Sequence, residues 1–226
     1  MNSLFRKYGF LTVVAVLFFA SASFAQTTTM TITGVGDGAN LAGVYVDPYT
    51  ATVGGATNVS VICDDWSDNV TIGESWTANV INLPTVGNSS LGTPLYGNNQ
   101  GLYNELAWLG TQLLANSTNP ATQDVISFAI WELTYSDYPY SPEAYPALST
   151  SEQALVTNEL ALANAETNFN GSGWAILTPA SGGPGEAQEF LVYTPESSAV
   201  VVLCADMLGL LGLVILFRRR LLRPVL

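Results

Sequence analysis

The sequence predicts an α+β fold: an antiparallel β-sandwich or barrel-like domain with a helical insertion, followed by a C-terminal transmembrane helix. In the first half of the chain, short runs rich in Thr and Val alternate polar and apolar residues, which is typical of strands. The middle of the chain changes to a helical period, and strand-like runs then return. This order of elements favours an antiparallel sheet over alternating βαβ units.

Each expected strand rests on a short alternating run. The expected strands are Thr29–Thr33, Leu41–Asp47, Asn58–Cys63, Trp76–Leu83, Trp174–Leu177 and Glu189–Tyr193. The sequence of the central domain, residues 26–193, shows no internal repeat, and its length is sufficient for one hydrophobic core.

The helical insertion is expected at about 101–168. Its first helix is indicated by apolar residues at helical spacing: Leu102, Leu106, Leu109 and Leu113. The second follows Asn119-Pro120, a cap with proline at the first helical position. Its apolar face is expected to hold Val125, Ile126, Ala129, Ile130 and Leu133. The third begins at Ser149, where Ser149-x-x-Glu152 fits a capping box, and is expected to run to about Asn168.

Charge separates the ends of the chain from the domain between them. All six cations lie near the termini: Arg6, Lys7, Arg218, Arg219, Arg220 and Arg223. The chain has no His, and all but two of its 18 acids, Glu196 and Asp206, precede position 196. A domain without Lys or Arg is not expected to bind nucleic acid or nucleotides. Without His or Lys it also cannot build a Ser-His-Asp or Cys-His device, so we expect no enzyme of those classes.

Both ends have the features of targeting segments. Residues 1–25 combine two cations, an apolar stretch and a small-residue cleavage site, which predicts a signal peptide that is removed before Gln26. Residues 194–198 form a polar patch, 199–217 an apolar stretch and 218–226 a basic tail. As a helix, the apolar stretch spans roughly 28 Å at ~1.5 Å per residue, about one bilayer core. The basic tail is expected to stay in the cytoplasm.

The C-terminal segments resemble the PEP-CTERM sorting signal of Gram-negative bacteria. That signal has a Pro-Glu-Pro patch, a membrane span and a basic tail, and is handled by an exosortase. Here the patch is Thr194-Pro195-Glu196, with Ser197 in place of the second proline. The resemblance implies export, an exosortase-type partner, and a protein that is either anchored in the membrane or released to the cell surface or matrix.

The densest acidic group, Asp64, Asp65, Asp68 and Glu74, follows the third expected strand. Asp64, Asp65 and Asp68 could hold Ca²⁺, which prefers carboxylate and carbonyl oxygens, although their spacing is not that of an EF-hand. A solvated turn is the alternative. Paired carboxylates could also hydrolyse glycosides if two of them faced each other at the required separation. No other cofactor is expected.

A second resemblance concerns the exported domain. Ile62-Cys63-Asp64-Asp65 is followed first by Tyr103-Asn104-Glu105-Leu106-Ala107-Trp108-Leu109 and then by Ser127-Phe128-Ala129-Ile130-Trp131. This order is similar to that in the thioester domains of bacterial surface adhesins. In those domains a strand Cys is joined to the Gln of a Gln-x-Ala-Ile-Trp stretch. Cys63 matches the Cys, but Ser127 stands at the Gln position, so the resemblance implies the fold without the covalent thioester. Cys63 is then expected to be a buried free thiol.

The sequence therefore predicts an exported structural or adhesive protein of the bacterial envelope or extracellular matrix, without catalytic activity. Its expected partners are the membrane, the processing enzyme and extracellular polysaccharide. The alternative is a carboxylate-based hydrolase acting on such polysaccharide. Two carboxylates facing each other in an aromatic-lined cleft would favour the hydrolase, and acids scattered over strand edges and turns would favour the structural role.

Overall fold

The computed structural model describes residues 26–36, 40–41, 43–46, 48–87, 92–135, 148–169, 171–181 and 187–194. The predicted signal peptide, the membrane helix, the basic tail and the patch residues Pro195 and Glu196 lie outside these residues. Within the described part of the chain, no helix combines the length and the apolar character needed to cross a bilayer.

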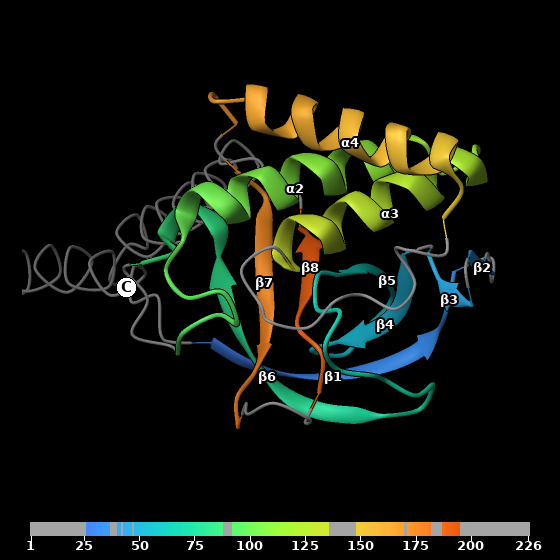
Figure 1. The fold of residues 1–226 in the computed structure, drawn as a ribbon. Helices are drawn as coiled ribbons and strands as arrows, with labels where there is room; N and C mark the ends of the chain where they lie inside the picture. Colours follow the sequence, from blue (N-terminus) through green and yellow to red (C-terminus); the bar gives the residue numbers. More distant parts are fainter. Residues whose placement is uncertain are drawn as a thin grey trace, which may run out of the picture.

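Six strands close into an antiparallel barrel, as Figure 1 shows. Around the barrel they run β1 (Gln26–Gly34), β4 (Tyr49–Val53), β5 (Ala56–Cys63), β8 (Phe190–Tyr193), β7 (Trp174–Pro179) and β6 (Ser75–Asn82). A separate two-stranded ribbon consists of β2 (Asn40–Leu41) and β3 (Val44–Tyr45). The predicted antiparallel, barrel-like class is confirmed for the part of the chain that the structure describes.

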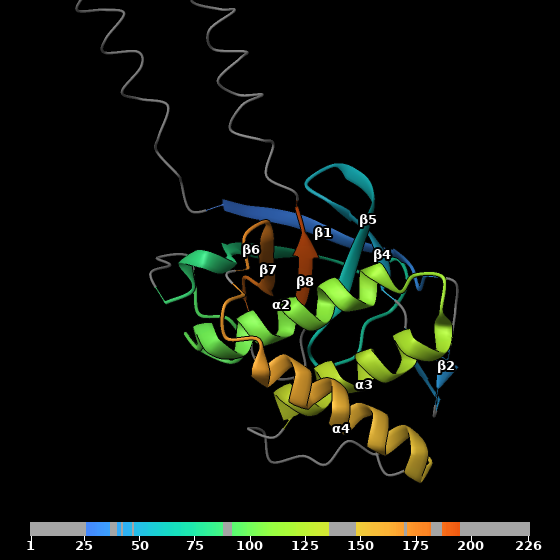
Figure 2. The same cartoon turned by 90° about the horizontal axis from the view of Figure 1, so that it is seen from above.

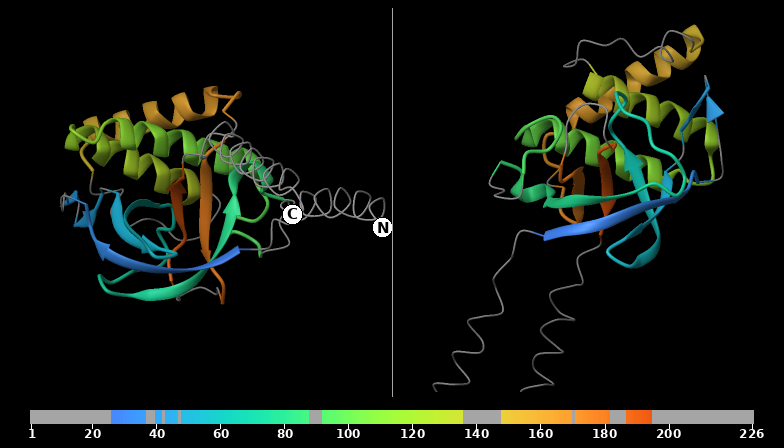
Figure 3. Two further views of the ribbon diagram at one scale, coloured as in Figure 1. Left: turned by 180° about the vertical axis from the view of Figure 1, so that it is seen from behind. Right: turned by 90° about the horizontal axis from the view of Figure 1, so that it is seen from below.

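The helices enter the chain between β6 and β7, two strands that are neighbours in the barrel. A short 3₁₀ turn, η2 (Leu83–Thr85), precedes α2 (Gln100–Ala115), α3 (Pro120–Tyr135) and α4 (Thr150–Ala165). Seen from above, all three helices cover one side of the barrel, and α4 is the outermost (Figure 2). The view from behind in Figure 3 places β1 and the start of β6 on the side away from the helices.

Strand alternation divides the buried side chains into two clusters. The first fills the barrel and includes Met30, Ile32, Ala51, Val61, Cys63, Leu177 and Phe190. The second lies between the barrel and the helices, and combines strand residues such as Ile62, Ile176 and Leu191 with the apolar faces of α2 and α3. Strand β7 is buried on both faces because the helices cover its outer side.

Close packing of α2 on β7 depends on Gly110. A Cβ at this position would lie 2.7 Å from Trp174 Cη2, a distance that real Cβ atoms essentially never show, and a tight 3.2 Å from Ile62 Cδ1. A glycine in the middle of a helix costs up to about 1 kcal/mol relative to alanine. At position 110 the absence of a side chain allows the axis of α2 to approach the sheet.

Several element boundaries differ from the sequence predictions. The run at 41–47, predicted as one strand, is divided between β2 and β3, with Gly43 at φ +89° in the turn. Strand β4 was not predicted because its five residues follow closely after the ribbon and a proline. Helix α4 ends at Ala165 rather than at about Asn168. Its predicted capping box is present: Ser149 Oγ accepts from the Glu152 amide, and Glu152 Oε2 accepts from the Ser149 amide.

Candidate functional site

The polar residues of the site gather where β5 ends and β8 begins. The two strands pair antiparallel with Cys63 opposite Phe190, so the register brings Asp64 opposite Glu189 one step further along. Because side chains alternate between the two faces of a strand, Cys63 points into the barrel while Asp64 and Glu189 point towards the helices. Both carboxyl groups are buried, with exposed fractions of 0% and 1%.

Asp64 and Glu189 form a carboxyl pair within hydrogen-bonding reach of each other. Glu189 also accepts a hydrogen bond from the Tyr103 hydroxyl at 2.5 Å and one from the Leu95 amide at 2.8 Å. Both carboxyl oxygens of Asp64 are buried, and no side chain of the described residues other than Glu189 lies within hydrogen-bonding reach of them. Two carboxyl groups can bond to each other only if one is protonated. The donors around Glu189 favour its charged form, so the proton belongs on Asp64.

Burial determines the titration of this pair. Desolvation, followed by the nearby Glu189 and Asp65 charges, raises the pKa of Asp64 well above its ordinary value. Desolvation also raises the pKa of Glu189, to about 7, against the lowering effect of the hydrogen bonds from Tyr103, Leu95 and Thr178. The pair therefore retains a proton at a pH where exposed carboxyl groups have lost theirs.

Asp65 has different partners from Asp64. Its Oδ1 accepts from the Ser67 amide at 2.9 Å and from the Ser67 hydroxyl at 2.7 Å. Burial raises the pKa of this carboxyl, and the Ser67 hydrogen bonds oppose the rise. Asp65 thus serves as the acceptor of a tight turn, while Asp64 faces the barrel–helix interface.

The two positions named by the thioester resemblance lie at the same end of the barrel. Cys63 Sγ donates to the Asp65 carbonyl at 3.1 Å, and the Cys63 carbonyl accepts from Trp131 Nε1 at 3.1 Å. Ser127 Oγ instead donates to the Val46 carbonyl. Burial, with the charges of Asp65 and Asp64, raises the pKa of the Cys63 thiol well above its ordinary value, which disfavours a reactive thiolate.

Gln188 was not singled out in the sequence, yet it ties the site together. Its Nε2 donates to the carbonyls of Asp65, at 3.0 Å, and Asp68, which lie 123 and 120 positions away along the chain. Since both partners are acceptors, the amide nitrogen must face them, and Oε1 is left buried without a partner. Gln188 and Glu189 were missed because only the β5–β8 register brings them to the acidic segment, residues 64–68. Tyr96 and Tyr103 reach the site from the loop before α2 and from α2, a tertiary contact that no local pattern indicates.

Two hollows flank this segment. The aromatic hollow has a volume of about 300 Å³, and its walls include Tyr45, Tyr49, Cys63, Trp66, Trp131 and Gln188. The second, the loop hollow, has about 330 Å³, and its walls include Asn79, Thr93, Leu95, Thr178 and Glu189. Asp65 and Asp68 line both.

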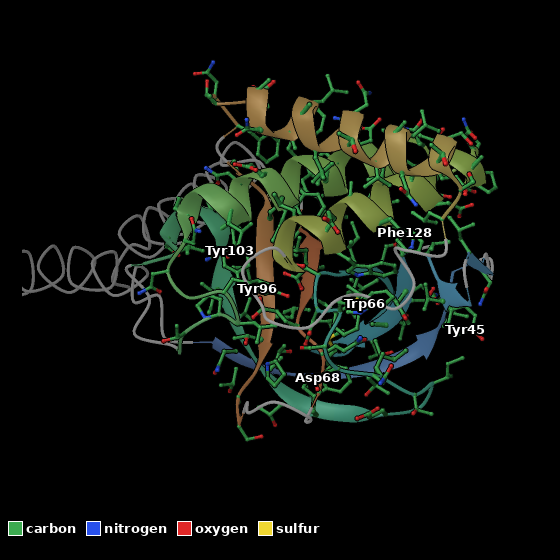
Figure 4. The ribbon with its side chains drawn as sticks, viewed as in Figure 1. Tyr45, Trp66, Asp68, Tyr96, Tyr103 and Phe128 are labelled. Atoms are coloured by element: carbon green, nitrogen blue, oxygen red, sulfur yellow. The ribbon has the colours of Figure 1, made fainter. Side chains whose placement is uncertain are left out.

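Figure 4 shows how aromatic side chains divide between the two helices. Trp66 lies beneath α3 near Phe128, and its ring centroid is 5.0 Å from that of Trp131. Tyr96 and Tyr103 lie together beneath α2, with ring centroids 6.1 Å apart. The Tyr96 hydroxyl donates to the Asp64 carbonyl at 2.7 Å, so this second aromatic pair also fastens the acidic segment.

The acidic segment does not gather into a multidentate cluster. Within the described ranges, no group of three or more His, Cys, Asp or Glu side chains converges on one point. The carboxyl groups of Asp64 and Asp65 are directed to Glu189 and Ser67 respectively. Binding of Ca²⁺ by Asp64, Asp65 and Asp68 stays a prediction that only a binding measurement addresses.

No protein-family profile and no curated protein sequence matches this chain. Among solved structures, it is similar to the N-terminal domain of the Streptococcus pyogenes pilus tip adhesin Cpa. That match has 13% sequence identity and a TM-score of 0.43, and it covers 78% of this chain and 97% of the adhesin domain.

Proposed function

We propose that this chain is an exported, surface-sorted protein of the bacterial envelope or extracellular matrix whose domain is non-catalytic and attaches to extracellular polysaccharide. The observation that carries the proposal is the aromatic hollow. Tyr45 is 44% exposed at this opening, and Trp66 is half-buried beside it. Aromatic rings offer flat apolar faces to sugar rings, and neighbouring polar groups accept hydrogen bonds from sugar hydroxyls.

The negative charge of the domain indicates which class of polysaccharide the aromatic hollow can bind. No residue between Gln26 and Phe217 is a Lys, Arg or His, and Asp65 and Asp68 line the hollow. An anionic polymer would meet only like charge there, unless Ca²⁺ bridged the two. A neutral polysaccharide therefore fits the hollow best, and an acidic one would require the cation.

The enclosure of the carboxyl pair supports a non-catalytic role. Glycosidases hold their two carboxyl groups roughly 5–10 Å apart, with substrate or water between them. Asp64 and Glu189 lie opposite each other at the ends of paired strands, and the carboxyl oxygens of Asp64 are inaccessible to solvent. A substrate therefore has no access to the Asp64 carboxyl group in this structure.

A polysaccharide hydrolase is the alternative function. It is favoured by the fact that two carboxyl groups, Asp64 and Glu189, face each other close to aromatic side chains. It would require the pair to separate and to become accessible from the loop hollow, whose wall includes Glu189. Release of reducing ends from a panel of polysaccharides, lost in Glu189→Gln, would establish this alternative.

Surface sorting is supported by the place where the barrel ends. The amide of Thr194 donates to the Gly173 carbonyl at 2.7 Å, directly after the last residue of β8. The patch Thr194-Pro195-Glu196 thus begins where the last strand finishes. Cleavage by an exosortase-type enzyme after this point would leave every barrel strand intact, and without cleavage the predicted helix at 199–217 would anchor the protein.

The test of the binding role is a glycan-binding screen of the full-length protein in detergent, with and without Ca²⁺. The variants Tyr45→Ala and Trp66→Ala are expected to lose binding. Tyr193→Ala is the matched control, because Tyr193 is 47% exposed but stacks on Trp174 outside the hollow. Binding that survives both hollow variants, or no binding to any neutral glycan, would contradict the proposal.

A further inference from the structure

The carboxyl pair joins three parts of the fold that are distant in sequence. Asp64 follows β5, Glu189 precedes β8, and the donors to Glu189 come from Leu95 in the loop before α2 and from Tyr103 in α2 itself. The Asp64 carbonyl holds Tyr96 of the same loop. These contacts fasten the loop and the start of α2 to the end of the barrel.

A proton is a structural component of this junction. Glu189 receives its donors from Tyr103 and Leu95, whereas the two oxygens of Asp64 have no side-chain donor among the described residues other than Glu189 and no access to water. The contact between the two carboxyl groups is attractive only while one of them is protonated. Two neighbouring buried carboxylates repel each other when both are charged, so the two groups do not both ionise without moving apart.

The other titratable groups around the pair do not supply a compensating charge. Asp65, from the segment after β5, adds negative charge near both members of the pair. Tyr96 and Tyr103 face it from the loop and from α2, and Cys63 lies beside it in β5. Burial together with the neighbouring carboxylates raises the pKa of both tyrosines and of the thiol, so all three stay neutral. The described residues include no cation.

We propose that the Asp64–Glu189 pair is a proton-dependent clasp, closed while it holds its single proton and opened when that proton is lost. Opening releases the loop at 92–99 from the barrel. Thr93, Pro94, Leu95 and Glu189 line the loop hollow, so release changes the shape of this hollow. None of these four residues lines the aromatic hollow, and ligand binding there is not required for the clasp to work.

Proton linkage predicts the direction in which the stability of the protein changes with pH if the clasp exists. A folded state that holds one more proton than the unfolded state loses stability as pH rises. For one proton, the unfolding equilibrium constant increases about tenfold for each pH unit. The window begins in the ordinary carboxyl range, about pH 4.5. It extends beyond the raised pKa of Glu189, about 7, to the raised pKa of Asp64, where the pair loses its last proton.

The decisive variant is Asp64→Asn, whose amide N–H₂ can donate to Glu189 at every pH. Full-length protein in detergent is unfolded with denaturant across this window. For each pH unit, the unfolding equilibrium constant of the wild type is expected to increase by a factor about ten times larger than the factor for Asp64→Asn. Asp68→Asn is the matched control: it makes the same change in the same segment, outside the pair, and should keep the wild-type slope.

Two measurements report on the clasp directly. Hydrogen exchange of residues 92–99, corrected for the intrinsic effect of pH, should accelerate in wild type above neutral pH and stay slow in Asp64→Asn. Infrared spectroscopy of the wild type should show a protonated carboxyl band that persists above pH 5 and then titrates away. That band tests the proposal even if Asp64→Asn does not fold, and Glu189→Gln serves as a second pH-independent variant.

Equal pH slopes in wild type and Asp64→Asn, or a wild-type protein without a protonated carboxyl band at pH 6, would overturn the clasp. Neither result depends on glycan binding. Failure of the clasp is therefore distinguishable from failure of the proposed polysaccharide attachment.

Discussion

The indole Nε1 of Trp131 donates to the main-chain carbonyl of Cys63 over 3.1 Å. This contact fastens α3 to the last residue of β5, and the thiol of Cys63 then turns back to the Asp65 carbonyl. Gln123, one helical turn before Ser127, donates from Nε2 to the Leu113 carbonyl in α2. Gln123 is the glutamine closest in sequence to Ser127, the position where thioester domains carry Gln. Its side-chain amide is thus engaged at the interface between α2 and α3.

We therefore predict that Cys63 is a free thiol and not half of a thioester. Intact mass of the purified protein should show no deficit of one ammonia, and treatment with a small amine should add nothing. Alkylation should require unfolding, because Cys63 is only 6% exposed. Cys63→Ala should cost on the order of 1 kcal/mol of stability. An ammonia deficit that methylamine reverses would refute this.

The domain should be more stable near pH 5 than near pH 8. Burial raises the pKa of Asp64, Asp65, Glu105, Glu132, Glu159 and Glu189. Carboxyl groups with a raised folded-state pKa stabilise the fold below their unfolded value, and that stability is lost as pH rises through the folded value. Glu152 opposes the trend, because hydrogen bonds from Ser149 lower its pKa.

The cause of these shifts also predicts the salt response. Desolvation is the largest contribution for each raised carboxyl group, ahead of repulsion between acids. Salt screens exposed charges but does little for desolvated ones. Melting temperatures should thus respond more to pH than to added NaCl, and a melting temperature that climbs from pH 5 to pH 8 at low salt would contradict the prediction.

Tyr103→Phe should destabilise the protein by about 2 kcal/mol, the usual range for a hydrogen bond to a charged group. The substitution removes the O–H that donates to Glu189 at 2.5 Å and preserves the buried ring. The loss should grow with pH, because this donor stabilises the charged form of Glu189. Tyr45→Phe, at an exposed position, should change stability by no more than ~0.5 kcal/mol when both variants are unfolded in urea.

The sequence predicted well those features that depend on neighbours along the chain. The leucines of α2 and the capping box at Ser149 are local patterns, and both are present. The facing of Asp64 and Glu189 depends instead on the pairing of β5 with β8, and no local pattern encodes that register. Gln188 was missed for the same reason, since its partners Asp65 and Asp68 are more than 100 positions away.

The charge at each end of the chain predicts the mature N-terminus. Arg6 and Lys7 precede an apolar stretch and the small-residue site Ser23-Phe24-Ala25. Signal peptidase should cut after Ala25, so that mass mapping of the exported protein finds Gln26 first. The tail that begins at Arg218 should remain protected from external protease in intact cells before any sorting cleavage. An exported form that retains Arg6 would show that the segment is a permanent anchor.

Gly110→Ala should destabilise the protein although alanine favours helices. The added Cβ would meet Trp174 Cη2 at 2.7 Å, and overpacking of this kind typically costs about 1–3 kcal/mol. The gain in helix propensity, up to about 1 kcal/mol, does not offset that range. Gly101→Ala is the matched control in the same helix, because its Cβ would approach Asn99 Oδ1 at an ordinary 3.6 Å. Chemical denaturation should give opposite signs for the two variants, with Gly101→Ala neutral or stabilising. If Gly110→Ala were as stable as Gly101→Ala, α2 would not lie as close to β7 as the Gly110–Trp174 distance requires.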